Sequence, residues 1–323
     1  MFEARFFQAV AIVVSCLVAP IASSQTTYPT KAVKIVVPYP AGGATDSASR
    51  VYADGLSELL GQQFVVDNKG GGGTNIAASY VAHSDPDGYT LYAANFASNA
   101  VNKWLYRKLS YDPDKDFAAV SMMTISPMFL VVHPSVPVKS VKDLVNLAKA
   151  KPGKLTYGSP GFGSPNHIAA ELFRMETGIN AVHVPYKGSA LSSLALLSGE
   201  TDYIFDATAM IYVHSGRLKA LAVAYTKRWP TEPNIPSMAE LGFPSISVEP
   251  FFALVAPAKT PLAIRQKLND AARIVAKRPD VAKKLSPIGL IPVAYTLKET
   301  ADFLRVQGTK WAPVVKASGA VVD

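Results

Sequence analysis

Cysteine is almost absent from this chain: the 323 residues contain one, Cys16, in an apolar N-terminal stretch. The rest of the chain therefore has no disulfide and no thiol chemistry. Histidine is scarce too, and the five histidines are dispersed, with no H-E-x-x-H pattern to indicate a metal site. No basic run is interleaved with aromatic residues, so the net charge of +8 indicates no nucleic-acid surface. That charge is compatible with long-range attraction of anions.

Long apolar runs are missing as well, because no segment reaches the roughly 20 residues that span a bilayer. The N-terminus has Arg5, then the apolar stretch Phe6–Val18, then small residues, which are the three parts of a secretory signal. We predict a signal peptide of residues 1–24, cleaved before Gln25. An alternative stays open, because Val13–Cys16 resembles a lipobox and would attach a lipid to its cysteine.

The motifs of nucleotide-binding proteins and hydrolases are not found. Asn68–Thr74 contains four consecutive glycines, but it matches neither the Walker pattern nor G-x-G-x-x-G. Ser159 or Ser164 could be combined with His167 and Asp206 in a hydrolytic triad. The residue at the first glycine position of the hydrolase elbow G-x-S-x-G is, however, a tyrosine. We predict that the protein is not an enzyme and needs no cofactor or metal, with a secreted hydrolase as an alternative.

Short β-branched runs alternate with segments of helical period along most of the chain, which predicts an α/β fold with largely parallel sheets. We expect strands at Val33–Val37, Phe64–Val66, Tyr89–Ala93, Phe129–Val132, Leu155–Tyr157, Ala181–Val184, Tyr203–Phe205 and Leu218–Ala224. We expect helices at Ala44–Leu60, Thr74–Ala82, Val141–Ala150, Asn166–Thr177, Ser189–Leu197, Pro261–Ala276, Pro279–Leu285 and Leu297–Ser318. A chain of this length exceeds one hydrophobic core, so two lobes are expected. Because no low-complexity linker is present, the chain should cross between the lobes more than once.

Glycine-rich loops lie between predicted strands and helices at Pro38–Asp46 and Tyr157–His167. In an open α/β sheet, ligands bind at the carboxyl ends of the strands, where helix N-termini present unpaired N–H groups and a positive dipole. These loops therefore suit an anion. Phe162, in the second loop, is expected either to face the ligand or to cover the crevice. His183, in an apolar strand, is interpreted as a core histidine.

Taken in order, many short segments resemble the Bug-type family of periplasmic solute-binding proteins, the receptors of tripartite tricarboxylate transporters. The segments that carry the resemblance are Tyr28-Pro29, Pro40–Gly43 with Asp46, Pro86–Leu91, Tyr111–Pro113, Asp116-Phe117, Leu155–Ser159 with Gly161, Gly163 and His167, His183–Gly188, Phe205-Asp206, Gly216–Val223, Ala239–Gly242, Ala256-Pro257 and Trp311. They cover essentially the whole chain after the signal.

The resemblance implies a type II periplasmic-binding-protein fold, with two α/β lobes around a ligand cleft. We expect lobe 1 to comprise residues 25–125 and 229–323, and lobe 2 to comprise residues 126–228. The family holds a carboxylate through backbone groups, hydroxyls and waters. The residues expected to form the ligand site are Tyr39, Ala41, Gly42, Gly43, Asp46, Ser98, Asn99, Ser159, Gly161, Phe162, Gly163, Ser164, His167 and Asp206.

The implied function is capture of a small carboxylate in the periplasm for delivery to membrane transporter subunits. An aliphatic, amino-acid or aromatic acid is compatible with the sequence, and a monomer is expected. A periplasmic ligand sensor with a signalling partner is an alternative. The sequence departs from the family at Gly71–Thr74, where Gly-Ala-Gly-Gly is usual, at Ala77, where glycine is usual, and at Asn99, where histidine is frequent. These departures bear on which acid is bound.

Overall fold

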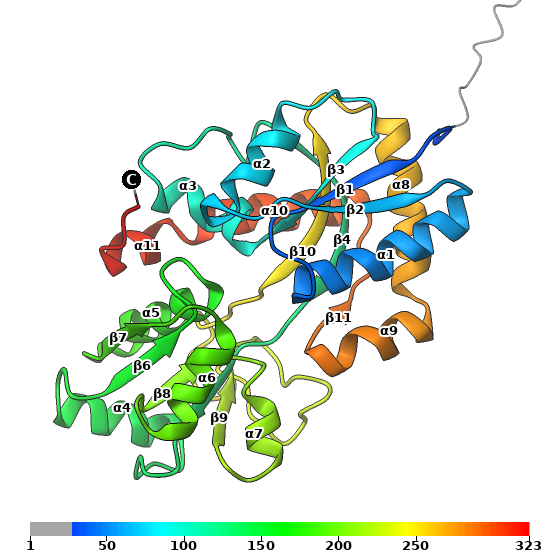
Figure 1. The fold of residues 1–323 in the computed structure, drawn as a ribbon. Coiled ribbons are helices and arrows are strands. Elements are labelled where there is room, and N and C mark those ends of the chain that lie inside the picture. The colour runs from blue at the N-terminus through cyan, green and yellow to red at the C-terminus, as the bar shows by residue number, and fades with distance from the viewer. Residues whose placement is uncertain (1–27, 323) are drawn as a thin grey trace, which may run out of the picture.

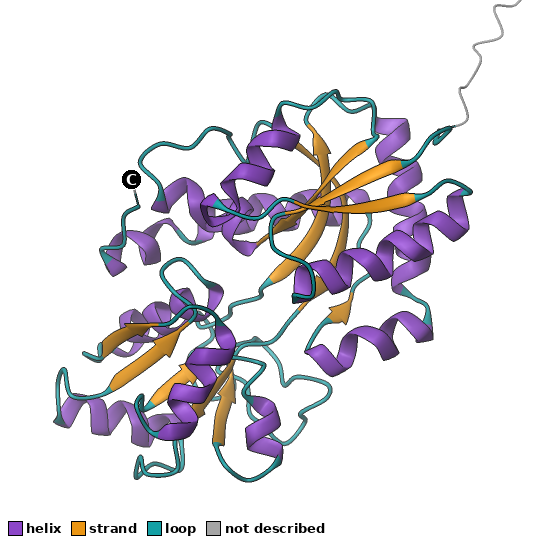
Figure 2. Cartoon of the chain, viewed as in Figure 1, coloured by secondary structure: helices purple, strands orange, loops and turns teal. Residues whose placement is uncertain are grey.

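The computed structural model describes residues 28–322, which form two lobes connected by two loop segments (Figure 1). The predicted signal peptide and Cys16 lie outside the described residues. Each lobe contains one β-sheet with helices on its faces, as the colouring of Figure 2 shows. Within residues 28–322, no helix has the length and apolar character needed to cross a membrane.

Lobe 1 is built around a six-stranded sheet with the order β11-β4-β10-β3-β1-β2. Strand β1 is parallel to β2 and β3, whereas β10 is antiparallel to both of its neighbours, β3 and β4. Its strands are β1 (Val33–Val37), β2 (Phe64–Asn68), β3 (Thr90–Asn95), β4 (Phe117–Ile125), β10 (Phe251–Pro257) and β11 (Ile291–Pro292). Its helices are α1 (Ala44–Leu60), α2 (Asn75–Ala82), α3 (Asn102–Leu105), α8 (Leu262–Ala276), α9 (Pro279–Leu285), α10 (Leu297–Lys310) and α11 (Ala312–Ser318), with short turns η1 (Gly72–Thr74), η2 (Ala97–Val101) and η3 (Ser286–Ile288).

Lobe 2 is built around a five-stranded sheet with the order β7-β6-β8-β5-β9. Strand β6 is parallel to β7 and β8, and β5 is antiparallel to β8 and β9. Its strands are β5 (Phe129–Val132), β6 (Thr156–Ser159), β7 (Val182–Pro185), β8 (Tyr203–Phe205) and β9 (Lys219–Val223). Its helices are α4 (Val141–Ala150), α5 (Pro165–Thr177), α6 (Ser189–Ser198) and α7 (Met210–His214).

The predicted alternation of strands and helices is confirmed, but the prediction of largely parallel sheets is wrong. In both sheets antiparallel strands pair next to parallel ones. In lobe 1 the reason is that the chain enters lobe 2 through β4 and returns through β10, and the returning strand is inserted antiparallel between β3 and β4. Neither β4 nor β10 was predicted from the sequence.

The C-terminal segment, predicted as one helix, is two helices that break at Trp311. Pro313, in the first turn of α11, lacks the N–H needed to continue α10. The Trp311 side chain is fully buried, and its Nε1 donates to Gln307 Oε1 at 2.9 Å. Helix α11 consequently turns away from α10 and packs against α5 of lobe 2 and α3 of lobe 1.

The two crossings between the lobes lie at residues 126–128 and near Pro250. Between β9 and β10, the chain stays with lobe 2: Met238 N donates to Val223 O at 2.9 Å, and Val248 N donates to Ala224 O at 3.0 Å. We therefore propose that lobe 2 comprises residues 126–249. This moves its predicted C-terminal boundary from residue 228 to residue 249.

Candidate functional site

A cavity of about 820 Å³ lies between the lobes, lined by residues from both. Of the residues predicted for the ligand site, those that line it are Tyr39, Ala41, Gly43, Gly161, Phe162, Gly163, Ser164 and Asp206. The predicted residues that do not line it are Gly42, Asp46, Ser98, Asn99, Ser159 and His167. In the second group Gly42 is exposed and the other five residues are buried, and their contacts explain what they do there.

On lobe 1, the cavity meets the N-terminus of α1. The N-cap residue is Gly43, which has no side chain to accept hydrogen bonds from the first turn. The N–H groups of Ala44 and Thr45 have no acceptor within the helix, because they belong to its first turn. Gly43, Ala44 and Thr45 all line the cavity, so these donors and the positive end of the helix dipole are available there.

Asp46 holds this loop rather than lining the cavity. Its Oδ2 accepts hydrogen bonds from Gly42 N and Arg50 Nε, both at 2.9 Å, and its Oδ1 accepts from Asn68 Nδ2 at 3.0 Å. Burial alone would raise the pKa of Asp46, but these hydrogen bonds outweigh burial and lower it. Asp46 is therefore a carboxylate whose charge is used to fix the loop before α1.

On lobe 2, the loop Pro160–Ser164 connects β6 to α5 and lines the cavity. Ser164 is the N-cap of α5: its Oγ accepts from His167 N at 3.2 Å and donates to Gly161 O at 2.7 Å. Phe162, at the tip, has 56% of its surface exposed. The Phe162 ring also contacts His167 and His183 edge-on, so one side of it rests on lobe 2.

Asp206 joins two cavity-lining segments of lobe 2, its own loop and the start of α5. Its Oδ1 accepts from Thr208 N at 2.7 Å and Thr208 Oγ1 at 2.8 Å, and its Oδ2 accepts from Asn166 Nδ2 at 2.8 Å. Burial raises the pKa of Asp206, although these hydrogen bonds oppose the rise. Nearby, α6 begins after Gly188, which gives no side-chain cap, and Gly188 and Ser189 line the cavity.

Ser159 and His167 lie behind the Pro160–Ser164 loop with His183. His183 Nε2 is 2.6 Å from Ser159 Oγ, and the His167 and His183 ring centroids are 4.4 Å apart. Burial, with the neighbouring His167, lowers the pKa of His183 to about 4, and burial also lowers the pKa of His167. The imidazole rings of His167 and His183 are therefore neutral near pH 7 and pack against the Pro160–Ser164 loop.

The triad considered from the sequence does not assemble. Ser164 Oγ donates to Gly161 O, and Asp206 is hydrogen bonded to Asn166 and Thr208. His167 Nδ1 accepts from Gly163 N at 3.4 Å rather than contacting a serine hydroxyl. Among residues 28–322 there is also no group of three or more metal-ligating side chains.

Ser98 and Asn99 are buried beneath the cavity. Ser98 Oγ donates to Asn99 Oδ1 at 2.7 Å, and Ser98 O accepts from Tyr111 OH at 2.9 Å. The polar residue that does line the cavity here is Asn95, at the end of β3. The predicted strand ended at Ala93, so extending it by two residues would have identified Asn95 as the strand-end polar group.

The remaining wall of the cavity is mostly apolar and was missed from the sequence. Its apolar side chains are Phe96, Leu105, Met128, Phe251, Phe252, Ile288 and Leu290. No lysine, arginine or histidine of the described residues lines the cavity, and Asp206 is its single charged lining residue there. Phe251, Phe252, Ile288 and Leu290 come from the C-terminal half, and no local pattern in the sequence places them beside the first glycine loop.

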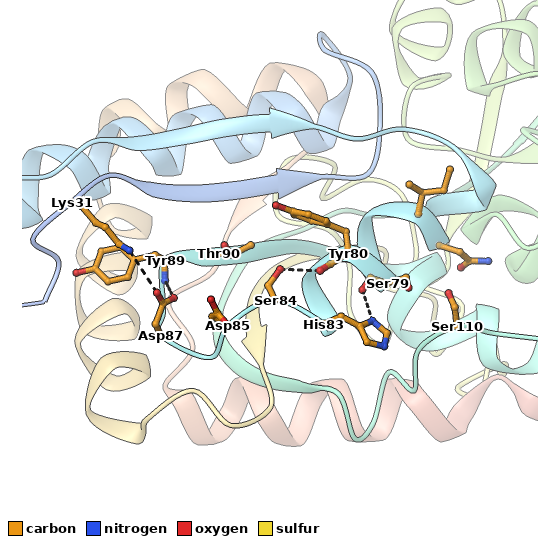
Figure 3. Close-up of a pocket in the computed structure, with 12 residues that line it drawn as sticks. Lys31, Ser79, Tyr80, His83, Ser84, Asp85, Asp87, Tyr89, Thr90 and Ser110 are labelled. Atoms are coloured by element: carbon orange, nitrogen blue, oxygen red, sulfur yellow. Dashed lines mark hydrogen bonds and ion pairs between the residues drawn. The ribbon is translucent and has the colours of Figure 1, made fainter.

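A second pocket, of about 940 Å³, lies on the outside of lobe 1 along α2 (Figure 3). It contains none of the predicted site residues. Two of its charged groups pair with each other: Lys31 Nζ is 3.8 Å from Asp87 Oδ2 and 4.4 Å from the Tyr89 ring centroid. None of the residues that line it has a buried side-chain polar atom without a hydrogen-bond partner within residues 28–322.

Residues 48–320 match the model of the tripartite tricarboxylate transporter family receptor. The chain is 34% identical to protein BugT of Bordetella pertussis, over 94% of each chain. Among solved structures, it is similar to an R. palustris protein determined with adipate, with 36% identity, a TM-score of 0.79 and coverage of 91% of this chain and 99% of that one. It is also similar to MatC from Rhodopseudomonas palustris with bound malate, with 30% identity, a TM-score of 0.75 and coverage of 89% and 100%. The predicted resemblance and the predicted two-lobed fold are thus confirmed.

Proposed function

Because the chain belongs to the tripartite tricarboxylate transporter receptor family, we propose that its interlobe cavity captures a small carboxylate attached to an apolar body. The observation that carries this proposal is the meeting of uncapped helix N-termini from both lobes at one cavity. Ala44 and Thr45, in the first turn of α1 on lobe 1, line the cavity, and so does Ser189, the first residue of α6 on lobe 2. The function is binding and delivery, not catalysis.

The physical basis is a set of fixed donors rather than a basic side chain. A hydrogen bond to a charged group contributes about 1.5–3 kcal/mol. Several such bonds together reach the roughly −8 kcal/mol that corresponds to micromolar affinity. The absence of lysine and arginine from the described cavity lining is therefore no obstacle to binding an anion.

The apolar wall of the cavity determines which kind of group can be attached to the carboxylate. Phe96, Phe251, Phe252 and Leu290 offer contact to an aliphatic chain or a ring, and Phe162 on lobe 2 can cover it. Similar proteins were solved with adipate and with malate. We expect acids with an apolar body, such as adipate or an aromatic acid, to bind more tightly than strongly polar ones, because the latter leave buried polar groups facing phenylalanine.

Delivery follows from closure of the two lobes. The lobes are joined through the two crossings and the contact of α11, so hinge motion can close lobe 2 on a ligand held by lobe 1. The membrane subunits of the transporter would recognise the closed form. In keeping with the predicted signal, we place this event in the periplasm and expect the receptor to act as a monomer.

The test uses ligand-stripped protein titrated by calorimetry with adipate, malate, glutamate, citrate and benzoate, and melted with each. Ligand at about a hundred times its dissociation constant stabilises by about 2.7 kcal/mol. Gly43→Val, which puts bulk at the α1 N-cap, should abolish binding and leave the melting curve of the ligand-free protein nearly unchanged. Tyr80→Ala, in the outer pocket, is the matched control and should bind like the unaltered protein. Failure of every acid to bind would overturn the proposal, and unaltered binding by Gly43→Val would move the site elsewhere.

A further inference from the structure

We infer that the side-chain amide of Asn95 donates a hydrogen bond directly to the ligand's carboxylate, an inference that rests on the proposed function. Asn95 is the last residue of β3 and lines the interlobe cavity, yet only 2% of its surface is exposed. Its Nδ2 is buried and has no hydrogen-bond partner among residues 28–322. A buried donor without an acceptor is costly, so such a group in a binding cavity indicates an acceptor supplied by a ligand.

The orientation of the amide is fixed by its other atom. Asn95 Oδ1 accepts a hydrogen bond from Ser98 N at 3.1 Å. Exchanging the amide oxygen and nitrogen would set the NH₂ group against that N–H, with two donors facing each other. The NH₂ group is therefore the end of the side chain that remains free.

The surroundings of Asn95 select the kind of acceptor. Strands β1 and β3 are parallel neighbours, with Val36 opposite Tyr92, so their carboxyl ends lie at the same edge of the sheet. The loop after β1 leads to α1, whose N-terminal residues line the same cavity as Asn95. A positive helix end beside an amide donor favours a carboxylate oxygen over a neutral carbonyl.

The carbon that carries this carboxylate meets apolar groups. Phe252 on β10 stands directly opposite Asn95, and Phe96 follows it in the chain, and both line the cavity. The ligand class is therefore an acid whose carboxylate is attached to a hydrocarbon chain or ring. Since β1, β3 and α1 all belong to lobe 1, this lobe recognises the carboxylate before lobe 2 closes.

The experiment compares two substitutions of Asn95 with one of another buried asparagine. Asn95→Ala removes the donor, and Asn95→Asp keeps an oxygen for Ser98 N but replaces the NH₂ group by an oxygen. Asn269 in α8 is the control, because it is fully buried, donates to Val120 O at 2.8 Å and has an unpartnered Oδ1 within residues 28–322, yet lies outside the cavity. Each variant is titrated by calorimetry with adipate, and with acetate as the smallest carboxylate, after circular dichroism has shown that it is folded.

We expect Asn95→Ala to weaken adipate binding by about 10- to 100-fold, the loss of one hydrogen bond to a charged group. Asn95→Asp should weaken it further at neutral pH, because two carboxylates then face each other. Its affinity should recover as the pH is lowered, since the introduced carboxyl group becomes a donor again once it is protonated. Asn269→Ala should lower the melting temperature and leave the affinity of the folded protein unchanged. In the unaltered protein, the ¹⁵N resonance of the Asn95 side chain should shift on addition of either acid.

Unchanged adipate affinity in Asn95→Asp across this pH range would overturn the inference while leaving the receptor function standing. So would an Asn95 side-chain resonance that does not move when adipate binds. If acetate and every acid of the panel, adipate included, fail to bind the unaltered protein at the highest soluble concentration, the inference fails together with its premise. If both Asn95 variants are unfolded, the resonance shift in the unaltered protein decides the question.

Discussion

Gly163 of lobe 2 and Leu105 of lobe 1 approach each other so closely that a β-carbon on Gly163 would lie 2.5 Å from Leu105 Cδ2. Gly163 has φ +73°, a backbone conformation that favours glycine. Both residues line the cavity. A glycine at this point therefore lets the loop of lobe 2 reach the wall of lobe 1.

Gly163→Ala should keep the lobes from closing fully and lower ligand affinity about tenfold, equivalent to about 1.4 kcal/mol. Calorimetry with the best acid of the panel measures the affinity, and small-angle X-ray scattering measures closure. Gly178→Ala is the matched control: its φ of +66° is similar, but a β-carbon there has nothing within 4 Å. It should lower stability by about 1 kcal/mol and leave affinity unchanged. The double variant Gly163→Ala with Leu105→Ala should regain part of the affinity, because the smaller side chain leaves room for the added β-carbon. If Gly163→Ala and Gly178→Ala lose the same ligand affinity, the contact between the lobes does not determine binding.

Asp46→Ala should weaken ligand binding although Asp46 does not line the cavity. Its removal frees the Gly42 amide, Arg50 and Asn68, and loosens the loop that positions the N-terminus of α1. We expect a loss of about 1–3 kcal/mol in the free energy of unfolding, measured by urea titration, together with weaker binding. Asp54→Ala, on the same helix, is the comparison and should change neither quantity by a comparable amount.

Stability should fall as the pH is lowered from about 6.5 towards 4, in part because of His183. Its folded-state pKa is about 4, below the unfolded value near 6.5, so only the unfolded chain takes up this proton in that window. Below about pH 4 the contribution is exhausted, because the folded state is then protonated too. His183→Gln can still hydrogen bond to Ser159 and should flatten the dependence of unfolding free energy on pH in this window. An unchanged slope in His183→Gln, measured by urea titration at several pH values, would contradict the assignment.

Trp311→Phe should destabilise the protein by about 1–3 kcal/mol. The indole N–H donates to Gln307 Oε1 in a fully buried setting, and phenylalanine leaves that oxygen without its donor. Trp104→Phe is the control: Trp104 also donates, to Gly308 O at 3.0 Å, but 41% of its surface is exposed. Because water can bond to Gly308 O in place of the lost indole N–H, the melting temperature of Trp104→Phe should change much less than that of Trp311→Phe. Similar changes in both variants would contradict the importance of burial.

Local sequence signals predicted much of the fold. Helices α1, α4 and α9 have the predicted bounds, because glycine, proline and cap residues mark their ends. Strands β4 and β10 were missed, since their place is set by pairing between segments more than a hundred residues apart. The direction of β10 could not be predicted either, because it follows from the return of the chain out of lobe 2.

In the candidate site, too, local features were predicted and features that depend on distant segments were not. The loops after β1 and β6 were predicted to face a ligand, and the cavity is lined by Gly43 of the first and Gly161 of the second. The role of Asp46 could not be seen, because it depends on Asn68 from the neighbouring strand. Asn95 was not predicted, because the predicted strand ended two residues before it. The apolar wall from β10 and η3 could not be predicted, because these segments meet the first glycine loop only in the folded protein.

The insertion of β10 between β3 and β4 also sets an order of assembly for a chain that emerges with its N-terminus first. Residues 126–249 are contiguous and are synthesised before β10, so lobe 2 can complete its sheet first. Lobe 1 cannot, because within the described chain β4 has no neighbour on either side until residues 251–257 and 291–292 emerge. The sheet of lobe 1 therefore stays incomplete, with one edge of β3 unpaired, until all of lobe 2 and then β10 have emerged.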